Sequence, residues 1–242
     1  MFDSNLAGSG GAIYMSQDAT LDVRHSIFNG NTAFVGVGSG GAIALGNGNT
    51  TIAGSRFTGN NAANGGAVFA TSTGGNTLFI RGSTFVNNAA GYLPNTSGGG
   101  VGGAIEVAGS TLITDIYASI FRDNHAINNG GAIGTISAGN TLAIRASTIT
   151  NNDAHLGGGL YYLGGPGLTV RGSVFSRNST INSGSGGAIF NIGHAIIRRS
   201  SITHNTAELD GGGIFNDTNA VTDLKATLVT NNTPNNVSGP TV

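Results

Sequence analysis

Two short motifs alternate along almost the whole chain and limit how it can fold. The first is Gly-Gly, then Ala or Gly, then an aliphatic residue, and its eight copies start at Gly10, Gly40, Gly65, Gly102, Gly130, Gly157, Gly186 and Gly211. The second is Phe, or an aliphatic residue in its place, three residues before an asparagine. The two motifs together repeat about every 27 residues. A fixed period of this length is typical of a solenoid, in which each repeat is one structural unit stacked on the next.

Each repeat contains three short runs of alternating apolar residues, as in 133–136, 142–144 and 147–149, with Gly, Asn, Ser and Thr between them. Alternation with turn residues between the runs predicts strands rather than helices. We therefore predict an all-β fold, a single parallel β-helix of about eight coils with about 27 residues and three short strands per coil. The domain covers residues 1–242 and starts mid-coil: 1–9 form a partial coil, 10–232 the eight coils and 233–242 a C-terminal tail.

The repeat places one column of residues in the core and another at a turn. The core column is aromatic and comprises Phe28, Phe57, Phe85, Phe121 and Phe175. The asparagines are expected to hydrogen-bond from coil to coil as an internal structural ladder, and they are Asn31, Asn60, Asn88, Asn124, Asn152, Asn178, Asn205 and Asn232.

Composition excludes several classes of protein. The hydrophobic fraction of 38% is too high for a disordered chain, and a net charge of −1 provides no bulk attraction to nucleic acid or to an anionic membrane. The absence of cysteine removes disulfides and thiolate metal sites. No 18-residue apolar run and no cofactor motif occur, so we expect no membrane insertion by this chain, no metal and no cofactor.

The paired motifs, from Phe2 to Asn232, resemble the repeats of chlamydial polymorphic outer-membrane proteins and related right-handed β-helix surface proteins. The resemblance implies a right-handed helix, export as the passenger of an autotransporter and a role in adhesion. Because this chain has neither cysteine nor a recognisable signal peptide, we expect at most a passenger or part of one. The expected location is extracellular or at the cell surface, with the signal and any anchor outside this chain.

One outward column is basic and comes after the last core residue of the second strand. Its cations are Arg24, Arg81, Arg145, Arg171, Arg198 and Lys225. Like charges one coil apart repel by roughly 1 kcal/mol in water. Two interpretations remain open: solvated side chains with local ion pairs to Asp22, Asp115 and Asp223, or a strip that binds acidic polysaccharide.

A second column comes after the first strand and is largely aromatic. It contains Tyr14, Phe69, Tyr161, Phe190 and Phe215. If the neighbouring aliphatic residues point inward, these rings point outward and suit sugar stacking or a protein contact. If the faces are reversed, the rings belong to the core.

Polar residues gather near the third corner of coils four to eight. Asp123, Arg177 and His204 precede the ladder asparagine, while His125 and Asp153 come after it. The longest insertion, 91–101 with Tyr92 and Leu93, starts from the same corner. Carboxylates, imidazoles and an arginine could perform acid–base chemistry on a polysaccharide, although polar residues also belong at corners for structural reasons alone.

We therefore expect a non-catalytic extracellular or cell-surface solenoid that serves as a stalk, an adhesin passenger or a head-to-tail filament subunit. Its expected partner is another copy of itself or a glycan or protein of a cell surface. The alternative is a domain that binds or cleaves polysaccharide with the corner residues.

Overall fold

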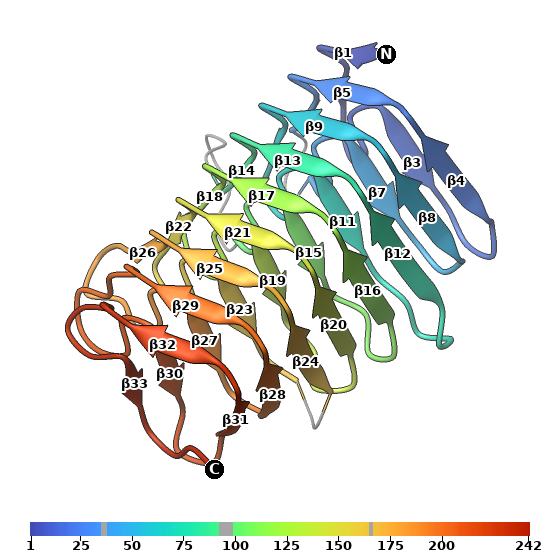
Figure 1. Ribbon diagram of the computed structural model, residues 1–242. Coiled ribbons are helices and arrows are strands. Elements are labelled where there is room, and N and C mark those ends of the chain that lie inside the picture. Colours follow the sequence, from blue (N-terminus) through green and yellow to red (C-terminus); the bar gives the residue numbers. More distant parts are fainter. Residues whose placement is uncertain (35–37, 92–98, 165–166) are drawn as a thin grey trace.

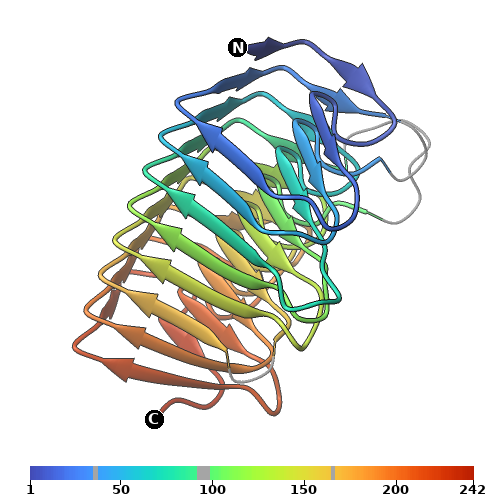
Figure 2. The same ribbon diagram turned by 90° about the vertical axis from the view of Figure 1, so that its right-hand side faces the viewer.

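The computed structural model describes residues 1–34, 38–91, 99–164 and 167–242, which wind into one parallel β-helix (Figure 1). About eight coils succeed one another, with equivalent positions about 28 residues apart. Figure 2 shows the coils stacked along a single axis, with the termini at opposite ends. None of the described residues forms a helix long and apolar enough to span a membrane.

The first two strands of each coil form sheets I and II. Sheet I starts after each Gly-Gly pair and contains β3 (Ile13–Met15), β7 (Ile43–Leu45), β11 (Val68–Ala70), β15 (Ile105–Val107), β19 (Ile133–Thr135), β23 (Leu160–Tyr162), β27 (Ile189–Asn191), β30 (Ile214–Asn216) and β33 (Val237–Ser238). Sheet II contains β4 (Leu21–Arg24), β8 (Thr50–Ala53), β12 (Thr77–Arg81), β16 (Ile113–Tyr117), β20 (Thr141–Arg145), β24 (Leu168–Arg171), β28 (His194–Arg198) and β31 (Val221–Lys225).

Sheet III carries the core phenylalanines. Its strands are β1 (Phe2–Asp3), β5 (Ile27–Asn29), β9 (Arg56–Thr58), β13 (Thr84–Val86), β17 (Ile120–Arg122), β21 (Thr148–Thr150), β25 (Val174–Ser176), β29 (Ser201–Thr203) and β32 (Leu228–Thr230).

A fourth sheet, absent from the three-strand prediction, comes after the ladder asparagine. Sheet IV consists of two-residue strands, which are β2 (Leu6–Ala7), β6 (Thr32–Ala33), β10 (Asn61–Ala62), β14 (Ala89–Ala90), β18 (His125–Ala126), β22 (Asp153–Ala154) and β26 (Ser179–Thr180). Two residues are too few to produce a visible alternation, so the pattern of apolar residues could not reveal them.

The core lies inside the coils and is built from equivalent side chains stacked on one another. Phe28 and Phe57 have ring centroids 4.6 Å apart, and Phe85 and Phe121 continue the stack with rings 4.8 Å apart. All four are fully buried, as are inward residues of the central strands of sheet I such as Ile105. The ring stack runs from Phe2 to Phe121, and beyond it Ile149, Phe175 and Ile202 continue the same buried column.

Buried asparagines close the corner between sheets III and IV. The Asn88 amide donates to Asn124 Oδ1 at 2.9 Å, and the Asn124 amide donates to Asn152 Oδ1 at 2.9 Å. The same amide groups also donate to backbone carbonyls, as from Asn124 to Phe85 at 3.1 Å. Every polar atom of the amide therefore has a partner inside an apolar environment.

The Gly-Gly pair forms the turn that leads into sheet I, and its two positions require glycine for different reasons. Gly102 has a φ of +64°, a conformation that residues with a Cβ rarely adopt. A Cβ on Gly103 would lie 2.1 Å from the carbonyl oxygen of Gly131 in the next coil. The first position thus requires glycine for its backbone angle, and the second for close contact between coils.

Candidate functional site

The aromatic column lies on the outward side of sheet I, but its rings differ in exposure. Tyr14 is 67% exposed, whereas Tyr161 and Phe190 are each only 8% exposed. Tyr161 stacks on Phe190 with centroids 5.5 Å apart, and Phe190 stacks on Phe215 at 4.9 Å. Of the two alternatives that the sequence left open, the outward face holds for this column, but Tyr161 and Phe190 are nevertheless buried: Tyr161 is stacked on one ring, and Phe190 lies between two.

Near the N terminus the same column is interrupted by a small residue. Ala44 pairs in register with Tyr14 on one side and with Phe69 on the other. The two aromatic residues are thus two coils apart, about 9.6 Å at the usual strand spacing. Ala44 is itself only 3% exposed, and we call the cavity that Tyr14, Ala44 and Phe69 line together the Tyr14–Phe69 slot.

Polar side chains surround the slot. A cavity of about 210 Å³ is lined by Tyr14, Ala44, Phe69 and Thr71 among others. A neighbouring hollow of about 620 Å³ extends from Tyr14 along the turns after sheet I, and its polar lining is Ser16, Gln17, Asn47, Thr71 and Thr73. Aromatic faces beside hydroxyl and amide groups are the combination that binds a sugar ring, which has apolar C–H faces and a polar edge.

The basic column on sheet II contains both paired and unpaired cations. Arg24 contacts Asp22 at 2.9 Å, Lys225 contacts Asp223 at 3.1 Å, and Arg145 pairs with Asp115 of the preceding coil. The Arg81 guanidinium lies 5.5 Å from the centre of the Phe79 ring. Arg171 and Arg198 are exposed, and no acid within the described residues forms an ion pair with either.

The corner residues do not converge on one point. His125 and Asp153 occupy paired positions in sheet IV, and the His125 Nδ1 atom hydrogen-bonds to the Asp153 carboxylate. Asp123 instead forms an ion pair with Arg122.

Asp123, Arg177 and His204 share a different column, the turn position with positive φ, in separate coils. In the described part of the chain no three His, Asp or Glu side chains gather as around a metal ion. Tyr92 and Leu93 of the insertion lie outside the described residues.

One comparison with known proteins identifies the family. Residues 1–175, well over half of the chain, match the family model described as the right handed beta helix region. The chain belongs to the right-handed β-helix family. No curated protein and no solved structure matches this right-handed β-helix significantly.

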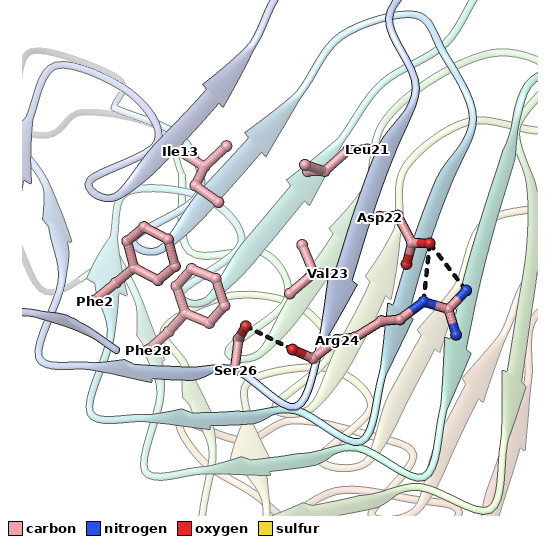
Figure 3. Close-up of a pocket in the computed structure, with 8 residues that line it drawn as sticks. All are labelled: Phe2, Ile13, Leu21, Asp22, Val23, Arg24, Ser26 and Phe28. Carbon is pink, nitrogen blue, oxygen red and sulfur yellow. Dashed lines mark hydrogen bonds and ion pairs between the residues drawn. The ribbon is translucent and has the colours of Figure 1, made fainter.

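At the N-terminal end of the right-handed β-helix the interior opens into an apolar cavity of about 380 Å³, which we call the mouth (Figure 3). Phe2 stacks on Phe28 at one side, while Leu21 and Val23 extend into the same space from β4. β4 is one of the two edge strands of sheet II. Asp22, Arg24 and Ser26 are also part of the lining, and the Arg24–Asp22 ion pair extends from β4 away from the two phenylalanine rings.

The outward column of this right-handed β-helix also contains a buried acid, which the sequence pattern did not single out as a functional residue. Glu106 lies between Phe69 and Gly134 in register, yet it is only 1% exposed. Its Oε2 atom has no hydrogen-bond partner within the described residues. Burial raises the pKa of this carboxyl to about 8. The sequence signal for Glu106 was an acidic residue at a column position that aromatic or small residues occupy in the other coils.

Proposed function

We propose that this right-handed β-helix is a non-catalytic adhesive element of a cell surface, which binds glycan in the Tyr14–Phe69 slot. The single observation that carries the proposal is the interrupted aromatic column, in which Ala44 separates two rings and polar groups line the rim. A sugar ring inserted there would stack against Tyr14 and Phe69 and hydrogen-bond to side chains such as Gln17. The repeat-level resemblance to passenger domains supports the extracellular location.

The decisive variant is Ala44→Phe, because the same chain provides its structural template. Phe190 fills the equivalent position between Tyr161 and Phe215 in a close stack. A phenylalanine at position 44 should stack in the same way, preserve the fold and close the slot. We expect glycan affinity, measured by calorimetry with the best ligand from a glycan array, to fall at least tenfold with the melting temperature maintained.

Tyr14→Ala and Phe69→Ala should weaken binding similarly by removing one wall each, since each ring would bury an apolar face of the sugar at about 25 cal/mol per Å² of apolar surface. Phe215→Ala is the matched control, because it removes a ring of the same column far from the slot. Equal affinities for wild type and Ala44→Phe would contradict this assignment of the binding site.

Polysaccharide cleavage is a second candidate, favoured by one contact. The hydrogen bond between His125 Nδ1 and the Asp153 carboxylate orients the imidazole, as in sites where a histidine acts as general acid or base. Release of reducing ends or unsaturated sugars from acidic glycans, abolished by His125→Ala, would establish this activity. Binding without turnover would leave the adhesive proposal in place.

A further inference from the structure

We infer that sheet II carries a second, independent site, which binds an acidic polysaccharide along the axis of the solenoid. The site consists of the residues that we call the basic strip: Arg81, Tyr117, Arg145, Arg171 and Arg198, one from each of five consecutive coils. It lies on a different sheet from the Tyr14–Phe69 slot and does not depend on the function proposed there.

The first argument is charge compensation along the column. Where an aspartate precedes the basic position by two residues, it neutralises a cation: Asp22 neutralises Arg24, and Asp223 neutralises Lys225. The corresponding residues before Arg171 and Arg198 are Thr169 and Ile196, which carry no charge.

Asp115 and Asp223, the acids of this face nearest in register, are already bound to Arg145 and Lys225. The register of the sheet therefore holds Arg171 and Arg198 side by side without an acidic partner from the described chain. Such a pair of like charges is relieved by an external anion.

The second argument is the shape and chemistry of the strip. Tyr117 is 50% exposed, and together with Arg81, Asp115 and Arg145 it lines a hollow of about 230 Å³. A pyranose ring can stack on the phenol while neighbouring acidic groups reach the guanidiniums, whose planar forks match both carboxylate and sulfate oxygens. A mononucleotide or a simple ion is short enough to contact only one end of the basic strip.

The third argument concerns length. Five coils at the usual strand spacing extend for about 19 Å along the axis, and the basic strip is only one side chain wide. A linear polymer with an acidic group at intervals can contact the hollow, Arg171 and Arg198 together, and several weak contacts then act in concert. Nucleic acid fits less well because its affinity comes from many phosphate contacts, whereas this chain has ten Lys and Arg residues in total and a net charge of −1.

The test uses the 242-residue chain and the double variant Arg171→Gln/Arg198→Gln, which removes both charges and keeps the apolar stems. Polygalacturonate presents carboxylates, dextran sulfate presents sulfate esters, and neutral dextran and single-stranded DNA are the comparison polymers. We expect binding to at least one of the two acidic polysaccharides at low ionic strength, decreasing as salt is added. The double variant should lose at least tenfold in affinity and show a shallower salt dependence.

Arg24→Gln is the matched control, since its charge is in the same column but paired with Asp22; we expect less than a twofold change. Tyr117→Ala should weaken binding severalfold. The melting temperature of the double variant should equal or exceed that of wild type, because the substitutions remove a repulsion, whereas a structural role for these arginines would lower it. Failure to bind either acidic polysaccharide, equal binding to neutral dextran, tighter binding to DNA, or an equal loss in Arg24→Gln would overturn the inference.

Discussion

Glu106 makes the stability of the molecule depend on pH. In the folded chain its pKa is about 8, compared with an ordinary value of 4.5, because burial disfavours the charged carboxylate. Between these two values the unfolded chain has lost the proton while the folded chain retains it. The unfolded state then binds fewer protons, so the free energy of unfolding decreases as pH rises through this window and levels off above about 8.

We therefore expect the unfolding free energy to fall between pH 4.5 and 8, with a slope of up to about 1.4 kcal/mol per pH unit attributable to this one group. Glu106→Gln keeps the shape of the side chain and cannot ionise, so its stability should exceed that of wild type increasingly toward pH 8. Denaturant titrations of both proteins at several pH values measure the difference, from which the contributions of the histidines cancel. Parallel pH profiles would contradict the role of Glu106.

Asn124 is the example with which to measure how much a buried ladder residue contributes to the free energy of unfolding. Its Oδ1 atom accepts from the backbone and side-chain nitrogens of Asn88, and its amide donates to Asn152 and to the carbonyl of Phe85. Asn124→Ala leaves these partners buried and unpaired, which should cost about 3 kcal/mol or more. Asn5→Ala, at the exposed end of the same ladder, should cost less than about 1 kcal/mol by chemical denaturation. Equal costs would mean that burial does not determine the value of each ladder residue.

At the scale of the strands, the sequence predicted sheets I, II and III because all their strands except the terminal β1 and β33 supply three to five residues with a visible alternation. Sheet IV required a different signal, a small residue two places after the ladder asparagine, as in Asn124-His125-Ala126. Ala90, Ala126 and Ala154 form a separate buried cluster at this point. The corner holds a small side chain, alanine in β14, β18 and β22 and threonine at Thr180 in β26, so composition at one position, rather than periodicity, identifies the strand.

The candidate sites were less predictable because neighbouring coils decide their exposure. Tyr14 and Phe190 occupy the same column, yet only the first is exposed. The difference arises from their neighbours in the adjacent coils: Ala44 places only a methyl group beside Tyr14, whereas Phe190 has a ring on either side. The alternation pattern gives the face of the sheet to which a side chain belongs, while burial on that face depends on residues about 28 positions away.

At the scale of the whole molecule, the coils of the 242-residue chain pair with one another along the axis, and within this chain β4 has a neighbouring strand on one side only. The mouth combines the edge strand β4 with the apolar side chains of Phe2, Leu21 and Val23. An uncovered edge with apolar residues beside it favours addition of another strand. A β-helix end differs from an ordinary sheet edge because several sheets and the core can continue together into the added coil.

For the purified 242-residue chain we therefore expect end-to-end association that increases with concentration, detected as larger species by sedimentation velocity and as rods in electron micrographs. Leu21→Lys places a charge in the mouth, where its desolvation opposes docking of another coil, and should shift the equilibrium to monomer. Leu209→Lys is the matched control, because Leu209 is 65% exposed and is not among the residues that line the mouth. A single monomeric species of wild type at every concentration would show that the mouth does not drive assembly, and equal dissociation by both variants would indicate a general charge effect.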